Sequence, residues 1–186
     1  GQGAMAAILG LSEEVLTELC QQVAEGEIVA PANLNAPGQI VIAGQRPAVE
    51  RVMQAAKGKG AKLVKLLEVS VPSHCILMKK AAKDLEQNFA ALSWQSARLP
   101  ILQNADAEPH TELKEIQAQL KAQLYSPVRW AESMQKLVAL YQPQLVLECG
   151  PGKVLTGMNK RMLTPPCLSL SEPQSFQEAL AQCQTA

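Results

Sequence analysis

The stretch Asn33-Leu34-Asn35-Ala36-Pro37-Gly38-Gln39-Ile40-Val41-Ile42-Ala43-Gly44 decides the fold of the first part of the chain. Two runs that predict strands, 28–34 and 39–43, flank an Asn-Ala-Pro-Gly sequence, in which proline fixes φ and glycine admits a positive φ. Two such runs around a short turn are typical of a β-hairpin. We therefore predict two paired antiparallel strands at this place.

Further elements are predicted on both sides of this hairpin. Before it, the apolar run 4–9 predicts a buried strand, and Ser12 can cap a helix that ends at Gly26. After it, Pro47 suits the first turn of a second helix, and 62–71 predicts a fourth strand. The order strand–helix–strand–strand–helix–strand is that of a ferredoxin-like, or split βαβ, fold. We predict that residues 1–71 form a small ferredoxin-like subdomain.

The remainder, residues 72–186, has a different pattern, in which helices alternate with short apolar strands. Such alternation predicts an α/β fold with a parallel sheet and helices on its faces. Only three short strands are present, and a three-stranded parallel sheet would leave its edges and apolar faces uncovered. We therefore expect these strands to belong to a larger sheet that is incomplete in this chain. The predicted elements are helices at 75–92, from Thr111, from Pro127, at 154–163 and at the carboxyl end, and strands at 99–102, 145–149 and 167–170.

Composition excludes several classes of protein for these 186 residues. Apolar residues make up 47% and charged residues 18%, which excludes a disordered polyelectrolyte. The 17 basic and 17 acidic residues cancel, so the basic excess that a general nucleic-acid binder needs is missing. No apolar run approaches the length of a membrane span. The five cysteines include no C-x-x-C pair, and Cys20, Cys149 and Cys167 lie in apolar stretches, which predicts buried reduced thiols and a cytoplasmic protein.

His74 is the strongest candidate for chemistry. It stands in Val69-Ser70-Val71-Pro72-Ser73-His74-Cys75, where a strand ends and a long helix begins. Catalytic residues favour such junctions, and a neutral imidazole can take a proton from a nucleophile. The alternative is a histidine that merely caps the helix. Neither adjacent nucleophile, Ser73 or Cys75, is expected to pair with it, because neighbouring side chains diverge.

Other features of the sequence are weaker candidates for a functional site. His110 lies in a polar loop and is expected to be exposed. The turn 150–153, Gly-Pro-Gly-Lys, could cradle an anion at a helix start or could be only a tight turn. Metal-ligand spacings are absent from the sequence, so no metal is expected. Four lysines could form either a solvated face or a surface for an acidic partner: Lys57, Lys59, Lys62 and Lys65.

Five segments of the chain occur in a fixed order: Gly3-Ala4-Met5-Ala6-Ala7-Ile8-Leu9-Gly10, the hairpin stretch 33–44, the His74 stretch 69–75, Gln123-Leu124-Tyr125-Ser126-Pro127-Val128-Arg129-Trp130 and Glu148-Cys149-Gly150-Pro151-Gly152-Lys153-Val154-Leu155. Together they resemble the malonyl-CoA:acyl carrier protein transacylase family of type II fatty acid biosynthesis. The resemblance covers nearly the whole chain, and the same segments occur more loosely in acyltransferase domains of polyketide synthases.

The resemblance implies an acyltransferase with a ferredoxin-like subdomain inserted in an α/β-hydrolase-like one, to which residues 72–186 would belong. It implies ping-pong transfer, in which a serine takes malonyl from malonyl-CoA and passes it to the phosphopantetheine thiol of acyl carrier protein, without a bound cofactor. His74 matches the general base. Gln123 matches the residue whose backbone carbonyl orients that base. Asn33, Asn35 and Asn104 match polar residues of the substrate cleft.

Three family features are absent from this sequence: the amino-terminal Gly-Gln-Gly-Ser-Gln segment, the Gly-His-Ser-Leu-Gly segment with the serine, and the arginine that binds the malonyl carboxylate. We expect them in a missing amino-terminal segment of the same protein, so that this stretch alone is inactive. Two other interpretations stay open at this point. The chain could be a non-catalytic module that binds acyl carrier protein through its lysines, or part of a polyketide synthase acyltransferase of other acyl specificity.

Overall fold

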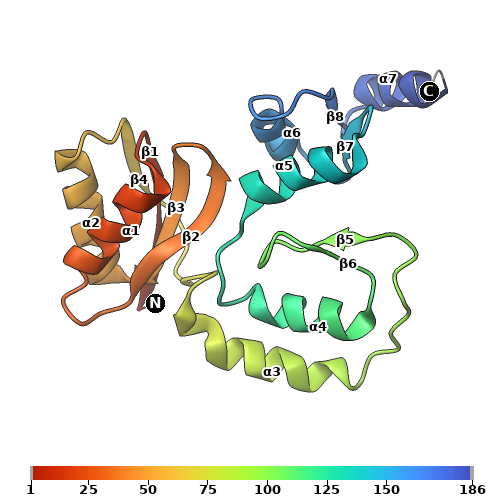
Figure 1. The fold of residues 1–186 in the computed structure, drawn as a ribbon. Coiled ribbons are helices and arrows are strands. Elements are labelled where there is room, and N and C mark those ends of the chain that lie inside the picture. Colours follow the sequence, from red (N-terminus) through yellow and green to blue (C-terminus); the bar gives the residue numbers. More distant parts are fainter. Residues whose placement is uncertain (1, 185–186) are drawn as a thin grey trace. The chain divides into compact units, whose positions relative to one another are not determined.

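The computed structural model describes residues 2–184, which form two compact units (Figure 1). One unit runs to Trp130 and the other begins at Ala131. The units therefore divide at a different place from the subdomain boundary predicted between residues 71 and 72. The boundary between residues 71 and 72 remains a prediction about the subdomains of a larger fold to which this chain would belong.

The first unit is built on a four-stranded antiparallel sheet with the order β2-β3-β1-β4. Two helices, α1 and α2, alternate with these strands along the chain (Figure 1). The predicted order of elements over the first seventy residues is therefore confirmed. The fourth strand is shorter than predicted, since it ends at Leu66 rather than at residue 71. The elements are β1 (Gly3–Leu9), α1 (Glu13–Gln22), β2 (Val29–Ala36), β3 (Gln39–Gln45), α2 (Arg46–Gly58) and β4 (Leu63–Leu66).

The hairpin of β2 and β3 closes as its sequence predicts. Ala36 pairs with Gln39 across the turn, and Gly38 has a φ of 70°, which glycine adopts without the steric penalty of a Cβ. The pairing of β2 shifts register between Pro31 and Asn33 and again between Leu34 and Ala36. Register shifts of this kind re-aim side chains at a sheet edge. Both shifts lie beside Asn33 and Asn35, two of the candidate site residues.

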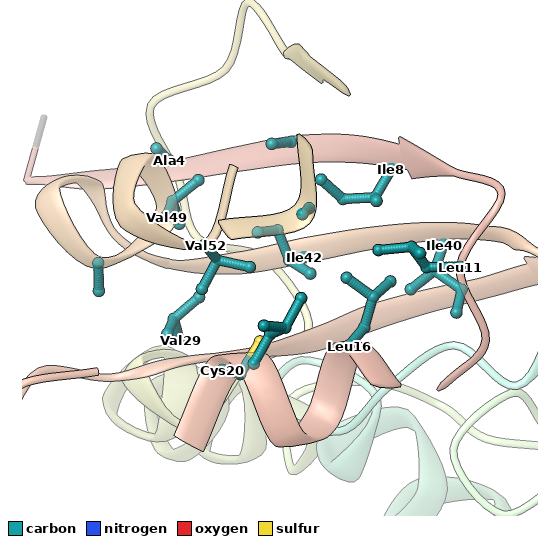
Figure 2. Close-up of a cluster of buried hydrophobic side chains, with 14 residues drawn as sticks. Ala4, Ile8, Leu11, Leu16, Cys20, Val29, Ile40, Ile42, Val49 and Val52 are labelled. Atoms are coloured by element: carbon teal, nitrogen blue, oxygen red, sulfur yellow. The ribbon is translucent and has the colours of Figure 1, made fainter. Parts of the chain in front are cut away.

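The main core lies between this sheet and its two helices. Figure 2 shows side chains from β1, β3, α1 and α2 directed toward one another. Because nearly every apolar group here is withdrawn from water, this core is the main stabilising feature of the unit. The largest fully buried side chains are Ile8, Leu16, Ile42, Val49 and Val52.

The opposite face of the sheet carries a smaller apolar cluster of Met5, Ala32, Val41, Ala43 and Cys75. Cys75 comes from the segment that follows β4, so this cluster fixes that segment against the sheet. The residue before it is the candidate base.

The rest of the first unit consists of the 3-10 turn η1 (Ile76–Met78), α3 (Lys79–Phe89), β5 (Ile101–Leu102), β6 (Pro109–His110) and α4 (Leu113–Ala122). The helix predicted over 75–92 is thus shorter at both ends. It ends at Phe89, where the Trp94 indole Nε1 donates a hydrogen bond of 2.9 Å to the Phe89 carbonyl oxygen. The strand predicted at 99–102 does not join a parallel sheet, because the chain turns back after it and β5 pairs antiparallel with β6.

The second unit carries the parallel pairing that the sequence predicts. Strands β7 (Val146–Glu148) and β8 (Cys167–Ser169) run parallel, and α6 (Val154–Asn159) connects them. Helices α5 (Trp130–Tyr141) and α7 (Pro173–Gln184) precede and follow this pair. The described fold is therefore mixed α/β, with separate small sheets rather than one large sheet.

The cysteines are all unpaired thiols in the described part of the chain. Cys20, Cys75 and Cys167 are buried. Cys149, expected to be buried, is exposed, because β7 ends at Glu148 and the chain turns outward into the following loop. None of the helices within residues 2–184 combines the length and the apolar character needed to cross a membrane.

Gly44 in β3 gives a direct test of this sheet. A Cβ added there would collide with the backbone oxygen of Ile28 and lie 2.6 Å from the Cα of Val29, whereas a Cβ added at Gly58 would meet nothing within 4 Å. We expect Gly44→Ala to lower the free energy of unfolding by about 1–3 kcal/mol. Gly58→Ala is the matched control and should be neutral or slightly stabilising, because alanine favours helices. Urea denaturation measures both, and equal effects would contradict the described packing of β2 on β3.

Candidate active site around His74

His74 lies in a constrained loop between β4 and η1. Its φ is 61°, a left-handed conformation that is uncommon for a residue with a side chain. Two contacts hold the loop there, one made by the His74 backbone and one made by the neighbouring Cys75. The His74 N–H donates to the Leu124 carbonyl oxygen at 3.0 Å, and Cys75 is buried in the cluster on the sheet. The ring therefore projects from a segment fixed on both sides.

One hydrogen bond sets the chemistry of the His74 ring. Its Nδ1 lies 2.7 Å from the backbone carbonyl oxygen of Gln123. A carbonyl oxygen can only accept, so Nδ1 carries the proton and Nε2 of the neutral ring keeps its lone pair. Within residues 2–184, Nε2 has no hydrogen-bond partner. The arrangement can therefore accept a proton at Nε2 from a hydroxyl or thiol within hydrogen-bonding distance.

The two neighbouring nucleophiles are not arranged to react with this base. Burial raises the pKa of the Cys75 thiol, which donates instead to the Pro72 carbonyl oxygen at 3.2 Å. Ser73 makes no side-chain hydrogen bond to His74 among the residues that the structure describes. The expectation that neither neighbour pairs with His74 agrees with these contacts.

Residues 123–129, the chain that leaves α4, connect the candidate site segments; we call them the connecting segment. It meets the His74 loop at Gln123 and Leu124. Farther along, the Val128 N–H donates to the Ala32 carbonyl oxygen at 2.8 Å, and the Val128 carbonyl oxygen accepts from the Leu34 N–H at 2.8 Å. These bonds add one parallel bridge to the free edge of β2, beside Asn33. The connecting segment thus joins the sheet edge to the His74 loop.

The connecting segment also holds the turn between β5 and β6. The Arg129 N–H donates to the Asn104 carbonyl oxygen at 2.9 Å, and the Arg129 side chain donates to the Asp106 carbonyl oxygen at 2.9 Å. The structure therefore attaches the two neighbours of Asn33, and the Asn104 backbone itself, to the same short segment that carries Gln123.

The three asparagines predicted in the cleft are half-buried. Asn33 stands opposite Val41, so it lies on the same face of the sheet as Cys75. Asn35 lies in the shifted part of β2, and Asn104 lies in the turn after β5. Their side-chain amides make no hydrogen bond to other described residues, so they remain available to a ligand.

Comparisons with known proteins bear directly on this arrangement. A scan of protein-family models finds no match. The malonyl CoA-acyl carrier protein transacylases of Salmonella typhimurium and Escherichia coli K12 are 43% and 44% identical to this chain, over 98% and 97% of its length. This chain is homologous to malonyl CoA-acyl carrier protein transacylases. It spans 59% and 58% of the length of these two relatives.

Solved transacylase structures share the fold. An acyl carrier protein S-malonyltransferase from Vibrio cholerae superposes with a TM-score of 0.92 at 43% identity, covering 96% of this chain and 58% of its own. A malonyl-transacylase solved in complex with its type II polyketide acyl-carrier protein gives 0.93 at 41% identity, covering 98% of this chain and 59% of its own. The likeness to transacylases therefore extends over both compact units.

The four lysines predicted to bind an acyl carrier protein are exposed but do not form one patch. Lys57 and Lys59 lie at the end of α2, and Lys62 follows in the loop before β4. Lys65 stands opposite Ala7 in β1, whose side chain packs on the cluster around Cys75. It therefore lies on the sheet face that α2 does not cover. The first three lysines are one group and Lys65 is separate.

At the turn 150–153, a carboxylate of the chain itself takes two of the N–H groups that an anion cradle would use. The N–H groups of Leu155 and Thr156 at the start of α6 donate to the Glu148 carboxylate at 3.2 and 2.7 Å. Burial acts to raise the pKa of Glu148, but the hydrogen bonds from Thr156 and Leu155 outweigh it and hold the pKa below its ordinary value. Lys153 pairs with Glu172 at 3.4 Å. The alternative of a tight turn is the one the contacts support.

One cavity, of about 550 Å³, lies between α3 and α4 and does not include His74. Its lining residues include Phe89, Trp94 and Lys121. A cluster of side chains fit to hold a metal ion is also missing from residues 2–184. The candidate site is therefore defined by the His74 ring and its neighbours, not by this cavity.

His110 is a residue whose surroundings the sequence predicts wrongly. Its side chain is 16% exposed rather than free in a loop, because it lies between the carboxylates of Asp106 and Glu115. Asp106 precedes it by four residues and Glu115 follows it by five, in different elements. The signal that could have predicted these surroundings is the presence of acidic residues on both sides of His110 in the sequence, Asp106 and Glu115.

Proposed function

We propose that this chain is part of an acyltransferase of fatty acid biosynthesis, which moves malonyl from malonyl-CoA to the phosphopantetheine thiol of acyl carrier protein. The single observation that carries the proposal is the hydrogen bond between His74 Nδ1 and the Gln123 carbonyl oxygen, in a chain homologous to malonyl CoA-acyl carrier protein transacylases. That bond leaves Nε2 as the base that such a transfer requires.

In the proposed fold this base belongs to the junction of two subdomains. The antiparallel sheet with α1 and α2, within residues 1–71, is proposed as a ferredoxin-like small subdomain. Residues 72–186 are proposed as the carboxy-terminal part of an α/β-hydrolase-like subdomain. The parallel pair β7 and β8 supports this assignment.

The proposed reaction has two halves that use His74 in the same way. A serine hydroxyl from outside these 186 residues gives its proton to Nε2 and attacks the malonyl thioester, and the coenzyme A thiolate leaves and takes that proton from the imidazolium. In the second half, Nε2 takes the proton of the phosphopantetheine thiol. The thiolate attacks the acyl-serine, and the serine oxygen recovers the proton as it leaves.

The remaining residues have binding and orienting roles in this proposal. The Gln123 carbonyl keeps the ring in one tautomer, as a carboxylate does in the usual triad. Asn33, Asn35 and Asn104 are proposed to bind the substrate through their unpartnered amides. Malonyl-CoA and the carrier protein are substrates, and no bound cofactor is needed for the steps above. The unpaired thiols support a cytoplasmic protein.

A first test compares replacement of His74, the proposed base, with replacement of Gln123, whose carbonyl orients it. These 186 residues alone are expected to transfer no malonyl, because the serine is supplied from elsewhere. In a complete transacylase that contains them, His74→Ala should lower kcat/KM by about 10²–10⁴-fold. Gln123→Ala keeps the backbone carbonyl and should lose less than roughly tenfold, since the contact is not made by the side chain. Equal losses in the two variants, or full activity of His74→Ala, would reject the proposal.

A second test concerns the carrier protein. We propose that Lys57, Lys59 and Lys62 bind the acidic carrier through their positive charges. A malonyl-transacylase relative solved in complex with its own acyl-carrier protein supports a carrier protein as the partner. Reversing these three charges to Glu should weaken carrier binding roughly tenfold or more at low salt and flatten its salt dependence. Lys114→Glu on α4, equally exposed, is the control. Isothermal titration calorimetry that finds the same weakening in the control would reject the assigned surface.

A further inference from the structure

His110 lies between two carboxylates that come from different elements. Its Nε2 is 2.8 Å from Asp106 Oδ2 in the turn between β5 and β6, and its Nδ1 is 3.1 Å from Glu115 Oε2 in α4. The ring is mostly buried, with 16% of the side chain exposed. No step of the proposed transfer uses this histidine.

This geometry is complete only when the ring is doubly protonated. A carboxylate oxygen accepts hydrogen bonds, so each ring nitrogen must donate, and only the imidazolium has two N–H groups. The neutral ring can satisfy one carboxylate and turns a lone pair toward the other. Burial acts to lower the pKa of His110, but the hydrogen bonds and charges of Asp106 and Glu115 outweigh it and raise the pKa above its ordinary value.

Asp106 is also the centre of the turn that carries Asn104. Its Oδ1 accepts from the Glu108 N–H at 3.0 Å, and its carbonyl oxygen accepts from the Arg129 side chain at 2.9 Å. The Arg129 N–H in turn donates to the Asn104 carbonyl oxygen. Arg129 therefore connects Asp106 with Asn104, and a change in the contacts of Asp106 is expected to affect Asn104 through it.

We propose that the imidazolium of His110 is a latch that ties the 103–108 turn to α4 and thereby positions Asn104. The charged groups that face the ring are Asp106 from the turn and Glu115 from α4, and the Arg129 guanidinium binds the backbone of the same Asp106. His110 is thus a positioning residue. Its effect on substrate binding rests on the proposed function, whereas the contact that it makes between the turn and α4 does not depend on that function.

The direction of the pH effect follows from the raised pKa. The latch stabilises the folded chain fully below the ordinary histidine pKa of about 6.5. Its contribution is lost as the pH rises through the higher pKa of the folded state, where the ring becomes neutral and releases one carboxylate.

Nuclear magnetic resonance of the 186-residue chain tests the latch without any catalysis. Only two histidines are present, so His110→Gln identifies the His110 ring signal by its disappearance. We expect that signal to titrate above the ordinary value, and the amide signals of Asn104, Ala107 and Arg129 to shift with the same midpoint. Removing one partner in Glu115→Gln should lower the midpoint. Glu112→Gln, an exposed carboxylate at the start of α4, is the matched control and should not change it.

Amide signals of Asn104 and Arg129 that do not follow the His110 titration would overturn the proposal, as would an equal midpoint in the Glu115→Gln and wild-type chains. In a complete transacylase, His110→Gln should raise KM for malonyl-CoA more than it lowers kcat and should remove the pH dependence of KM in this window. An unchanged KM would overturn the positioning role while the transfer itself still proceeds. Absence of transfer in the wild type would instead reject the proposed function.

Discussion

The hydrogen bond from His74 Nδ1 to the Gln123 carbonyl oxygen is the interaction on which the rest of the candidate site depends. It joins residues 49 positions apart in the sequence and decides which ring nitrogen is free. A backbone carbonyl is neutral, so it stabilises an imidazolium less than a carboxylate does, and its main contribution is to fix the tautomer and the ring direction. That contribution requires a rigid backbone on both sides of the bond.

The fold supplies this rigidity through the two segments that meet there. Burial of Cys75 on the sheet and the left-handed backbone of His74 fix one side. The connecting segment fixes the other, since Val128 extends the edge of β2 and Arg129 holds the turn at Asn104. Backbone hydrogen bonds rather than side-chain ion pairs make these connections, so the site geometry is set mainly by the course of the chain.

Local patterns were enough to predict the elements of the first seventy residues and the place of His74. The turn at Pro37 and Gly38 and the apolar runs around it depend on short-range chemistry, which sequence spacing records. The pairing of His74 with Gln123 is not recorded in this way. It came from the resemblance to a family, because no periodicity connects a loop after one strand with a carbonyl beyond a distant helix.

At the turn before α6 the sequence left an anion cradle and a tight turn open, and the contacts favour the tight turn, because Glu148 in the preceding strand accepts from the N–H groups of Leu155 and Thr156. Two other expectations were wrong because a local partner changed the outcome. His110 has the sequence context of an exposed loop, but the turn at Ala107, with a φ of 58°, folds Asp106 back onto it. The strand at 101–102 pairs with the chain that returns from that same turn. Such contacts depend on backbone turns whose direction composition does not encode.

The most direct measurement of the central claim is the tautomer of His74 from the nitrogen-15 chemical shifts of its ring at a pH where the ring is neutral. The His74–Gln123 hydrogen bond predicts a protonated Nδ1 and a bare Nε2. A ring protonated at Nε2 would contradict it, since the nitrogen proposed as the base would then carry a proton and Nδ1 could not donate to Gln123.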